Sequence, residues 1–554
     1  MDLLGGIRSM SVRVLDRDIL FLAPTAHQML ALRERRQKGL GICRDICIVP
    51  PGILRAALVA NNSDALLQFS RQRLARRWPF ASAHLDLTLM LRLGFVIALS
   101  ALVGLVAMAP FVFAPALLPL LALIFLPPSW FRLTALMETP NRHRPARESL
   151  LEDVELPVYS VLIPLRDETG MVAQLAAAMQ ALDYPPEKLD IKFVVEADSA
   201  DTVAAVKPFL DDARFELIVV PKSAPHTKPK ALNYALPMVR GEHVVIYDAE
   251  DVPEPDQLRR AASQFVEDPC VDCLQAELAI DNADESWLTA LFAAEYSGLF
   301  GIMLPALAHW QLPMPLGGTS NHFRTSSLRE VGGWDAFNVT EDADLGIRFA
   351  RLRYRVGTLQ SRTYEEAPVT LGPWIRQRTR WMKGWMQTFI VHNRYPLRFL
   401  RDAGWRNFMV FQLYIGGMIL SAPLHVVFVS ALLVRAGIAI QSGALLHPMA
   451  FVHLFILTVG YIGAAALAFA GTARLARPGL TRYQFLLPLY WGLTGIAAFR
   501  AMYELVVRPY FWAKTGHGVT TRKRGGSFMR APQMRPKAAP IINLKNLGSA
   551  KERS

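Results

Sequence analysis

A long stretch without charge constrains this chain more than any other feature of its sequence. Between residues 93 and 127 there is no Asp, Glu, Lys or Arg, and most of these 35 residues are apolar. Such a stretch accommodates two short membrane crossings of about 17 residues each. Pro110 and Pro115 lie near its middle, where a hairpin would turn. Because the stretch begins about 90 residues into the chain, it is not a signal peptide. We therefore predict an anchored membrane protein.

The composition agrees with membrane anchoring. Of the 554 residues, 52% are hydrophobic and 19% are charged, whereas soluble domains are about 25% charged. These values argue against a wholly soluble enzyme and against disorder. The chain has four cysteines, which excludes a scaffold held together by disulfides.

Three further apolar stretches follow at residues 409–434, 450–471 and 484–508. The last carries Arg500, Glu504 and Arg508, so we expect it to lie in the membrane interface rather than to cross. Four spans result. Residues 520–554 hold nine Lys/Arg and one Glu, and such a tail faces the cytoplasm of a bacterial-type inner membrane. Both termini are therefore predicted to be cytoplasmic. Nucleic-acid binding is disfavoured, because no stacking platform or reading helix accompanies the tail.

Residues 150–400 have a different pattern, in which short apolar runs alternate with helical patterns. Four runs read as buried strands, at residues 160–164, 191–195, 216–220 and 243–247. Strands that alternate with helices predict a parallel α/β sheet. Ligands of such sheets bind beyond the carboxyl ends of the strands, so the polar residues there are the candidates for a site.

Carboxylates and lysines follow these strands. Asp248, Glu250 and Asp251 come directly after the strand at 243–247, and Lys228 and Lys230 lie in the loop before it. Three carboxylates within four residues repel one another unless they share a cation. Oxygen ligands favour Mg²⁺ or Mn²⁺, which bridge to phosphates. The alternative interpretation is a solvated acidic turn.

Two later clusters also allow two interpretations. Thr340 could cap a helix that has Glu341 and Asp342 in its first turn, or a carboxylate here could act as a general base. Residues 374–385 hold three tryptophans and four cations, which is typical of an interfacial helix. In the same segment, Arg380 could stabilise a departing diphosphate and Trp381 could stack on a sugar.

The order of these motifs resembles a known family. Asp198, Asp248-Ala-Glu250, Thr340-Glu341-Asp342 and Gln377-Arg-Thr-Arg380-Trp381 are similar to the D, DxD, TED and QxxRW signature of membrane-bound processive family-2 glycosyltransferases. Cellulose, curdlan, chitin and hyaluronan synthases belong to that family. The resemblance covers residues 155–520. One departure is Glu250, where the family has a second Asp.

The resemblance implies a fold, a donor and a metal. The fold is an α/β GT-A glycosyltransferase domain with a mixed, mainly parallel sheet, joined to α-helical transmembrane spans. The donor is a nucleotide sugar, with UDP-glucose as the default, and the cofactor is Mg²⁺ or Mn²⁺. Asp342, with Glu341 beside it, is the implied catalytic base.

The resemblance also implies binding roles. The implied donor-binding residues are Asp198, Glu168, Lys228, Lys230, Asp248, Gln377 and Arg380. The implied metal ligands are Asp248, Glu250 and Asp251. The implied acceptor-binding residues are Trp381, Gly318, Thr319, Ser320, Asn321 and Gln275. The implied gating residues are Lys514, Thr515 and His517.

The predicted organisation has five parts. Residues 1–90 form a cytoplasmic regulatory or docking domain, 91–130 a transmembrane hairpin, 150–400 the catalytic domain, 405–510 transmembrane and interfacial helices, and 511–554 a gating-like segment with the basic tail. The first part faintly resembles the N-terminal module of type II secretion ATPases, some of which bind cyclic di-GMP. Regulation by cyclic di-GMP or by an accessory protein is therefore an open expectation.

The predicted function is processive. An inverting β-glycosyltransferase would polymerise the donor sugar into an exopolysaccharide and pass it across the bilayer. Two alternatives stay open: a non-processive transferase that puts one sugar on a lipid carrier, and an inactive membrane scaffold.

Overall fold

The computed structural model describes residues 8–14, 17–24, 26–38, 46–112, 118–138, 150–443, 445 and 448–512. The N-terminal part begins with a small sheet of three strands, β1 (Ser9–Val14), β2 (Arg17–Leu22) and β3 (Ile46–Ile48). The helices of this part are α1 (Ala26–Gln37), α2 (Pro51–Asn61), α3 (Ser63–Arg77), η2 (Pro79–Ala81) and α4 (Ala83–Asp86).

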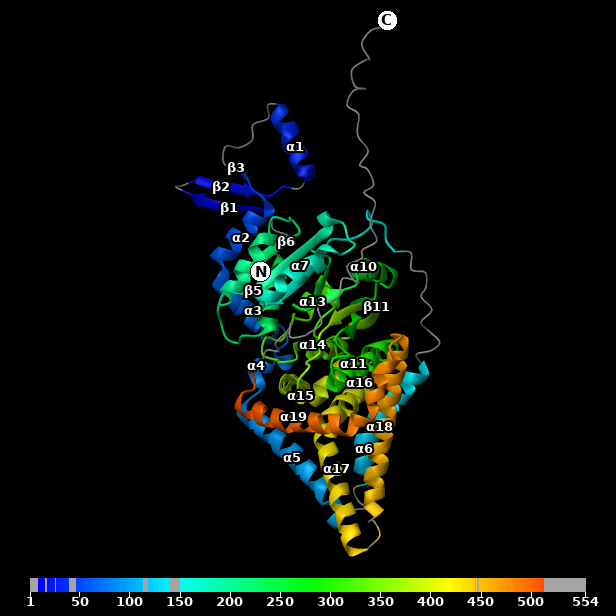
Figure 1. Cartoon of the computed structure of the whole chain (residues 1–554). Helices are drawn as coiled ribbons and strands as arrows, with labels where there is room; N and C mark the ends of the chain where they lie inside the picture. Colours follow the sequence, from blue (N-terminus) through cyan, green and yellow to red (C-terminus); the bar gives the residue numbers. More distant parts are fainter. Residues whose placement is uncertain are drawn as a thin grey trace. The chain divides into compact units, whose positions relative to one another are not determined.

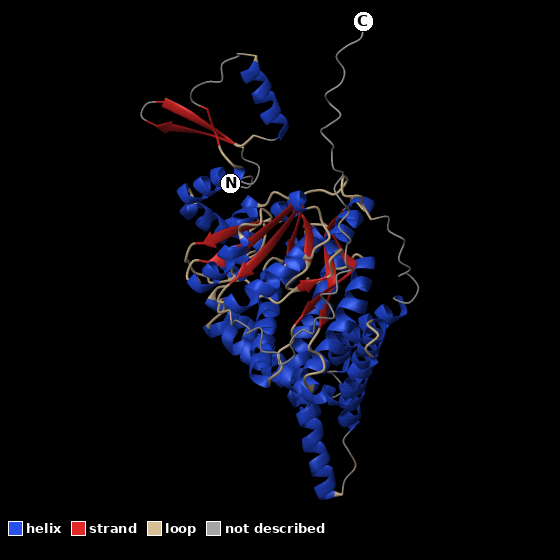
Figure 2. Cartoon of the chain, turned by 45° about the horizontal axis from the view of Figure 1, so that its top comes forward, coloured by secondary structure: helices blue, strands red, loops and turns tan. Residues whose placement is uncertain are grey.

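The centre of the fold is an eight-stranded sheet with the order β6-β5-β4-β7-β10-β9-β11-β8 (Figures 1 and 2). The strands are β4 (Tyr159–Leu165), β5 (Leu189–Glu196), β6 (Phe215–Val220), β7 (His243–Ile246), β8 (Val252–Pro253), β9 (Val271–Ile280), β10 (Asn321–Arg324) and β11 (Arg355–Glu365). β6, β5, β4 and β7 pair in parallel, whereas β10 runs antiparallel to β7 and β9. The predicted mixed, mainly parallel sheet is confirmed.

Helices connect these strands and continue into the membrane part. Those of the sheet domain are α7 (Val172–Gln180), α8 (Ala200–Val206), α9 (Lys228–Ala235), α10 (Gln257–Glu267), α11 (Trp287–Gly298), α12 (Leu304–His309), α13 (Thr325–Glu330) and α14 (Glu341–Arg351). The remaining long helices are α5 (Leu89–Val112), α6 (Leu118–Glu138), α15 (Leu371–Asn393), α16 (Pro396–Val410), α17 (Gly417–Ser442), α18 (Pro448–Arg474) and α19 (Leu487–Val507).

The predicted strands form because their residues are apolar on both faces. Every residue of β5 is buried, and helices cover both faces of a parallel sheet. Three charged residues lie buried in this strand, Asp190, Lys192 and Glu196. Lys192 is fully buried and donates to Asp190 at 3.0 Å and to Glu216 at 2.6 Å. Burial alone would raise the pKa of Asp190, but Lys192, Arg240 and a hydrogen bond from Ser160 lower it to about 2. This buried charge is therefore compensated.

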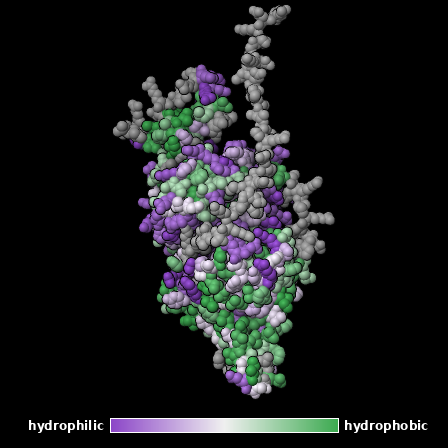
Figure 3. Space-filling model, viewed as in Figure 1, coloured by the Kyte–Doolittle hydropathy of each residue, from purple (hydrophilic) through white to green (hydrophobic). Residues whose placement is uncertain are grey.

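Five helices among the described residues are long and apolar enough to cross a membrane. They span Leu89–Ala107, Trp287–His309, Pro396–Ser442, Ala450–Arg474 and Pro478–Val507. Figure 3 shows apolar surface gathered at the end of the molecule where α5, α17 and α18 lie. The second helix of the predicted hairpin is α6, which is 21 residues long and is not one of the five.

The helical segment 287–309 did not figure in the sequence prediction. It contains α11 and α12, and 78% of its most apolar window is buried inside the protein. A Cβ on Gly471 of α18 would lie 2.3 Å from the carbonyl oxygen of Ser297 in α11, so the two helices are in backbone contact. The apolar surface of segment 287–309 is therefore largely covered by other helices.

The predicted interfacial stretch forms α19. In Figure 1 this helix runs across α17 rather than alongside it. Its charges are paired, since Glu504 accepts from Lys383 of α15 at 3.1 Å and from Arg500 at 3.2 Å. Length and composition alone would also allow this helix to cross a membrane. The interfacial interpretation stays a prediction.

The crossing of α17 and α19 depends on one glycine. A Cβ on Gly495 would lie 2.3 Å from Cγ2 of Val426 and 2.7 Å from the carbonyl oxygen of Ala422, whereas one on Gly492 would meet nothing within 4 Å. We expect Gly495→Ala to lower the thermal unfolding temperature in detergent, because the helices must separate. Gly492→Ala should leave it unchanged or raise it, since Ala favours the helix by about 1 kcal/mol. Equal effects would contradict this packing.

Candidate active site

The carboxyl ends of β4, β5 and β7 open into one cavity. Its lining includes Glu168 after β4, Glu196 at the end of β5, and Asp248 and Glu250 after β7. These strands are parallel neighbours, so their ends meet at the same edge of the sheet. Polar residues were predicted to gather at this edge of the sheet, and these four side chains lie there.

The turn after β7 is held by Asp251. Its Oδ2 atom accepts from the backbone N–H of Asp248 at 2.6 Å and from the hydroxyl of Thr319. Asp251 is buried and does not line the cavity. Burial and the neighbouring Asp248 and Glu250 raise its pKa well above the ordinary value. The structure thus gives the Asp251 side chain a role in shaping the turn and does not support the predicted role as a metal ligand.

Lys228 connects the clusters that the sequence kept apart. Its ammonium pairs with Oδ1 of Asp248 and donates to the carbonyl of Gly318 at 2.6 Å. Burial acts to lower the pKa of Lys228, but Asp248, Glu341 and Asp342 outweigh burial and raise it. Carboxylates from β7 and from α14 therefore act on one lysine.

Gly318 lies between the carboxylates of Asp248 and Asp342. A Cβ at this position would lie 3.3 Å from Oδ2 of Asp342 and 3.9 Å from Oδ2 of Asp248. Residues 94 positions apart thus face each other across the loop before β10. A shared site for these two motifs was implied only by the family resemblance, and Gly318 is the residue whose lack of a side chain leaves room for it.

The pKa values of Glu341 and Asp342 suit a proton acceptor. Burial and then Asp342 raise the pKa of Glu341 to about 7, while Lys228 and Arg380 act to lower it. Burial also raises the pKa of Asp342, against the lowering effects of the Ala343 amide, Lys228 and Arg380. Carboxylates with raised pKa values are stronger bases than exposed ones.

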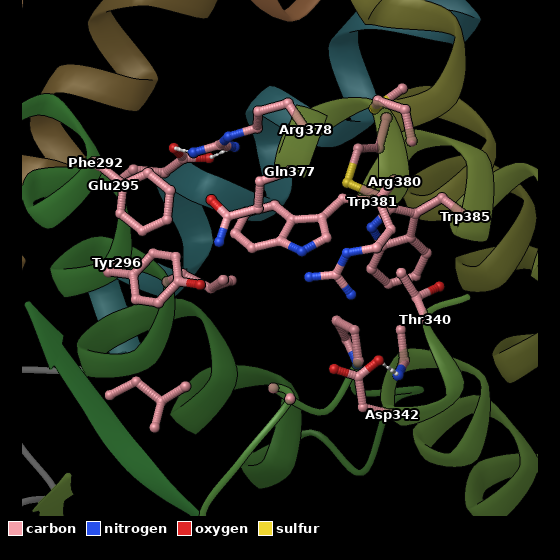
Figure 4. Close-up of a pocket in the computed structure, with 18 of the residues that line it drawn as sticks. Phe292, Glu295, Tyr296, Thr340, Asp342, Gln377, Arg378, Arg380, Trp381 and Trp385 are labelled. Carbon is pink, nitrogen blue, oxygen red and sulfur yellow. Dashed lines mark hydrogen bonds and ion pairs between the residues drawn. The ribbon is translucent and has the colours of Figure 1, made fainter. Parts of the chain in front are cut away.

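Helix α15 forms the opposite wall. Figure 4 shows Gln377, Arg380 and Trp381 projecting from it into the space above Asp342. The helix packs directly on the loop that precedes Asp342, since a Cβ on Gly384 would lie 2.1 Å from Oγ1 of Thr340. The side chain of Gln387 also accepts from the Val339 amide at 3.1 Å. The position of Asp342 is thus tied to α15.

An arginine between the motif residues anchors this wall. Arg378 forms a two-pronged ion pair with Glu295 of α11, at 2.9 Å for one prong, and donates to the hydroxyl of Tyr490 in α19 at 2.6 Å. Its guanidinium lies 4.8 Å from the ring centroid of Trp381 (Figure 4). Arg378 and Glu295 were not predicted as a pair, because no local sequence pattern relates them.

The cavity continues from the carboxylates into the membrane helices. Its volume is about 510 Å³. Beyond Trp381, its walls come from the long apolar helices, with these residues: Phe125, Pro128, Ser129 and Arg132 of α6; Met418, Ser421, Ala422 and His425 of α17; Ile456, Leu457, Gly460, Ala464, Leu467 and Ala468 of α18; and Leu487, Tyr490, Trp491 and Thr494 of α19. Catalytic and membrane segments therefore share one space.

Several predicted site residues lie outside this cavity. Asp198 is exposed and does not line it, whereas Glu196, two residues earlier, lines it and pairs with the buried Lys230 at 2.9 Å. Gln275 is buried beneath the loop, where its Oε1 accepts from the Gly317 amide at 2.7 Å. These observations indicate supporting roles for Lys230 and Gln275.

The residues of the predicted acceptor loop also fall into two groups, those that line the cavity and those that bond to neighbouring strands and loops. Gly318 and Thr319 line the cavity. Ser320 donates to Thr363 at 2.6 Å, and Asn321 donates to the carbonyl of Gly317 at 2.7 Å. The predicted gating residues Lys514, Thr515 and His517 lie outside the described residues. Trp512 is the last described residue, and its ring lies 5.5 Å from the Arg380 guanidinium at the cavity.

The sheet end of the cavity is lined by more carboxylates than cations, so a bound cation would be electrostatically favoured there. Its lining there holds eight carboxylates, Glu168, Glu196, Asp248, Glu250, Glu341, Asp342, Glu365 and Glu366, against three cations, Arg166, Lys228 and Arg380. The described residues form no group of three or more His, Cys, Asp or Glu side chains arranged to hold a metal by themselves. Mg²⁺ commonly uses one or two carboxylates and takes its other ligands from phosphates and water. Asp248 and Glu250 fit such a site.

Comparisons with known proteins identify the chain's central part. Residues 243–468 match the family model described as glycosyl transferase family group 2. The chain is 30% identical over 233 residues to the probable glycosyltransferase YdaM of Bacillus subtilis (strain 168), which covers 42% of this chain and 56% of that protein.

Two further relatives differ in what their names say they make. Identity is 27% over 278 residues to a β-monoglucosyldiacylglycerol synthase of Synechocystis, covering 49% of this chain and 56% of that protein. It is 28% over 253 residues to a UDP-forming cellulose synthase catalytic subunit of Pseudomonas fluorescens, covering 44% of this chain and 33% of that protein. The matched part thus spans about half or less of each relative. The matched residues include Asp248, Asp342 and Trp381, and this part of the chain is similar to family-2 glycosyltransferases.

Proposed function

We propose that the protein is a processive, inverting β-glycosyltransferase that extends a glycan with hexosyl units from a nucleotide sugar, with UDP-glucose as the default donor. The supporting observation is the single cavity that joins the carboxylates of the sheet edge to the walls of four long helices. A donor at the sheet edge and a chain leaving along these helices would both fit this space. The name of the cellulose synthase relative agrees with this proposal.

The proposed reaction is a single displacement. Asp342 accepts the proton of the acceptor hydroxyl, whose oxygen bonds to the anomeric carbon as the bond from that carbon to the diphosphate breaks. The electron pair of the broken bond passes to the diphosphate, where Lys228 and Arg380 offset the new charge. Asp248 and Glu250 would hold a divalent ion, which supplies further neutralisation of the diphosphate. Attack opposite the leaving group inverts the anomeric centre.

Transfer of one sugar to a lipid is the second candidate. Two observations favour it: the cavity is lined in part by helices suited to a membrane, and a relative is named for diacylglycerol glucosylation. In this case Trp381 would stack on the sugar being transferred, and the helix walls would hold the lipid. The two functions differ in the size and solubility of the product.

The product assay separates these candidates. Membranes containing the protein are incubated with radiolabelled UDP-sugars and Mg²⁺ or Mn²⁺. We expect label in high-mass material that a glucanase digests. Asp342→Asn should lower incorporation by about 10²- to 10⁴-fold, because the base is lost, while donor binding persists. Label only in a lipid-soluble product would support the lipid acceptor, and an Asp342→Asn variant as active as wild type would exclude Asp342 as the base.

The rate should depend on pH through Glu341 and Asp342. Because burial raises their pKa values, the proton acceptor is neutralised as the pH falls through the raised values, so activity is lost on acidification and present above them. Arg380 acts to lower both pKa values. We therefore expect Arg380→Gln to move the acid limb of the pH–rate profile to higher pH, in addition to lowering kcat. An acid limb that stays in place would argue against electrostatic coupling between Arg380 and the base.

Contact between α15 and the loop before Asp342, residues 331–340, which we call the base loop, gives a further prediction. Gly384→Ala should place a methyl group against Thr340 and shift Asp342, so we expect kcat to fall by about tenfold or more. Gly372→Ala in the same helix is the matched control, because its nearest neighbour is the flexible end of Arg376 at 3.5 Å. Rates are compared at saturating donor. Similar rates for both variants would show that the base does not depend on this contact.

A further inference from the structure

The loop that leads to the catalytic base is held from behind by N-terminal residues. This loop, residues 331–340, begins after α13 and ends where α14 starts with Glu341. Its back is covered by α3, η2 and α4, which lie more than 240 positions earlier in the sequence. We call residues 63–86 the N-terminal clamp.

The first half of the clamp caps the end of α13. Arg77 donates from Nε to the carbonyl of Glu330 at 2.7 Å, and Trp78 donates to the same carbonyl at 3.1 Å. Arg73 donates to the carbonyl of Arg329 at 3.2 Å. The last carbonyls of a helix lack partners within it, so the clamp supplies the donors that fix the point where the loop begins.

Two glycines allow the clamp to approach. Gly332 and Gly333 both have positive φ, at 92° and 69°, which side chains other than glycine rarely adopt. A Cβ on Gly332 would lie 3.0 Å from Cδ1 of Leu74. The Gly332-Gly333 turn is therefore shaped to the surface of α3.

The second half of the clamp holds the middle of the loop. The backbone N–H of Ala83 donates to Oδ2 of Asp335 at 2.6 Å, and the Phe337 amide donates to Oδ1 of the same carboxylate at 3.0 Å. The ring of His84 stacks on Phe337 with a centroid distance of 4.0 Å. Asp335 thus ties the clamp to the loop six positions before Glu341.

The clamp also touches the helix that carries the donor-side lysine. Asn233 of α9 donates to the carbonyl of Ser70 at 3.1 Å and to that of Trp334 at 2.7 Å. Lys228 begins the same helix. One side chain therefore connects the clamp, the base loop and the lysine that pairs with Asp248.

From these contacts we propose that the N-terminal clamp is a positioning element of the active site, which sets the place of Asp342 and Lys228 without touching substrate. The proposal deepens the proposed function and rests on it for its kinetic consequences. Residues 8–61 join the clamp through α2, which ends at Asn61, one residue before the cap of α3. A ligand or partner that moved these residues would therefore act on kcat through the base loop.

The test uses two exposed side chains of the clamp, so that folding is preserved. Arg77→Ala removes the contact to Glu330, and His84→Ala removes the stacking on Phe337. Arg76→Ala is the matched control, because Arg76 is an exposed neighbour whose side chain, among the described residues, bonds only to Gln72 of its own helix, at 2.8 and 3.2 Å. The full chain in detergent is used throughout.

Kinetics give the first measurement. We expect the Arg77→Ala/His84→Ala variant to lose about fivefold to tenfold in kcat while its KM for the donor stays within about twofold. When Arg77→Lys replaces Arg77→Ala in the double variant, part of the lost kcat should return, since Lys can donate one hydrogen bond. A double variant with wild-type kcat, or one that changes only the donor KM, would overturn the proposal.

Hydrogen exchange gives a second measurement that needs no substrate. Backbone amides of residues 331–340 should exchange faster in the double variant than in Arg76→Ala. If wild-type protein transfers sugar from no donor, the proposed function fails while this measurement still tests the clamp. Unchanged exchange in the loop would overturn the clamp, whatever the activity.

Discussion

The crowding of carboxylates at one edge of the sheet is the constraint on which the rest of the site depends. Asp248, Glu341 and Asp342 come close enough to act on one lysine, and a buried cluster of this kind is stable only if positive charge is supplied. Lys228 supplies part of it and Arg380 another part. In the proposed function, the donor's diphosphate with a divalent ion would complete the balance, so that charge compensation and substrate binding would be the same event.

Much of the sheet and its edge was predictable from sequence, for a clear reason. Strands buried on both faces are mostly apolar runs, as in residues 160–164 and, apart from Lys192, in residues 191–195, and the polar residues that follow them must lie at the edge. Glu168, Asp248 and Glu250 are found there. Asp198 also follows a strand but is exposed, whereas Glu196, two residues earlier, lines the cavity, because β5 ends at Glu196 and Asp198 lies in the turn beyond it.

Other parts of the site could not be found in that way. The pairing of Arg378 with Glu295 joins residues 83 positions apart, and neither lies in a motif whose pattern predicts the other. The apolar run at 287–309 is interrupted by Glu295, and the arginine partner that neutralises this residue is visible only in three dimensions. The contacts of residues 63–86 with the base loop depend in the same way on distant pairing, because α3 and α4 show ordinary helical patterns.

Helix α15 belongs as much to the membrane part as to the catalytic part. At one end it carries Gln377, Arg380 and Trp381, and along its length Arg378 donates to Tyr490, Lys383 pairs with Glu504, and Gln387 donates to the carbonyl of Pro509 at 2.9 Å. A hybrid enzyme built from two such proteins therefore cannot be joined between α15 and α16 without separating each of these partners. Its junction has to precede residue 371, so that the helix is inherited together with the membrane segments against which it packs.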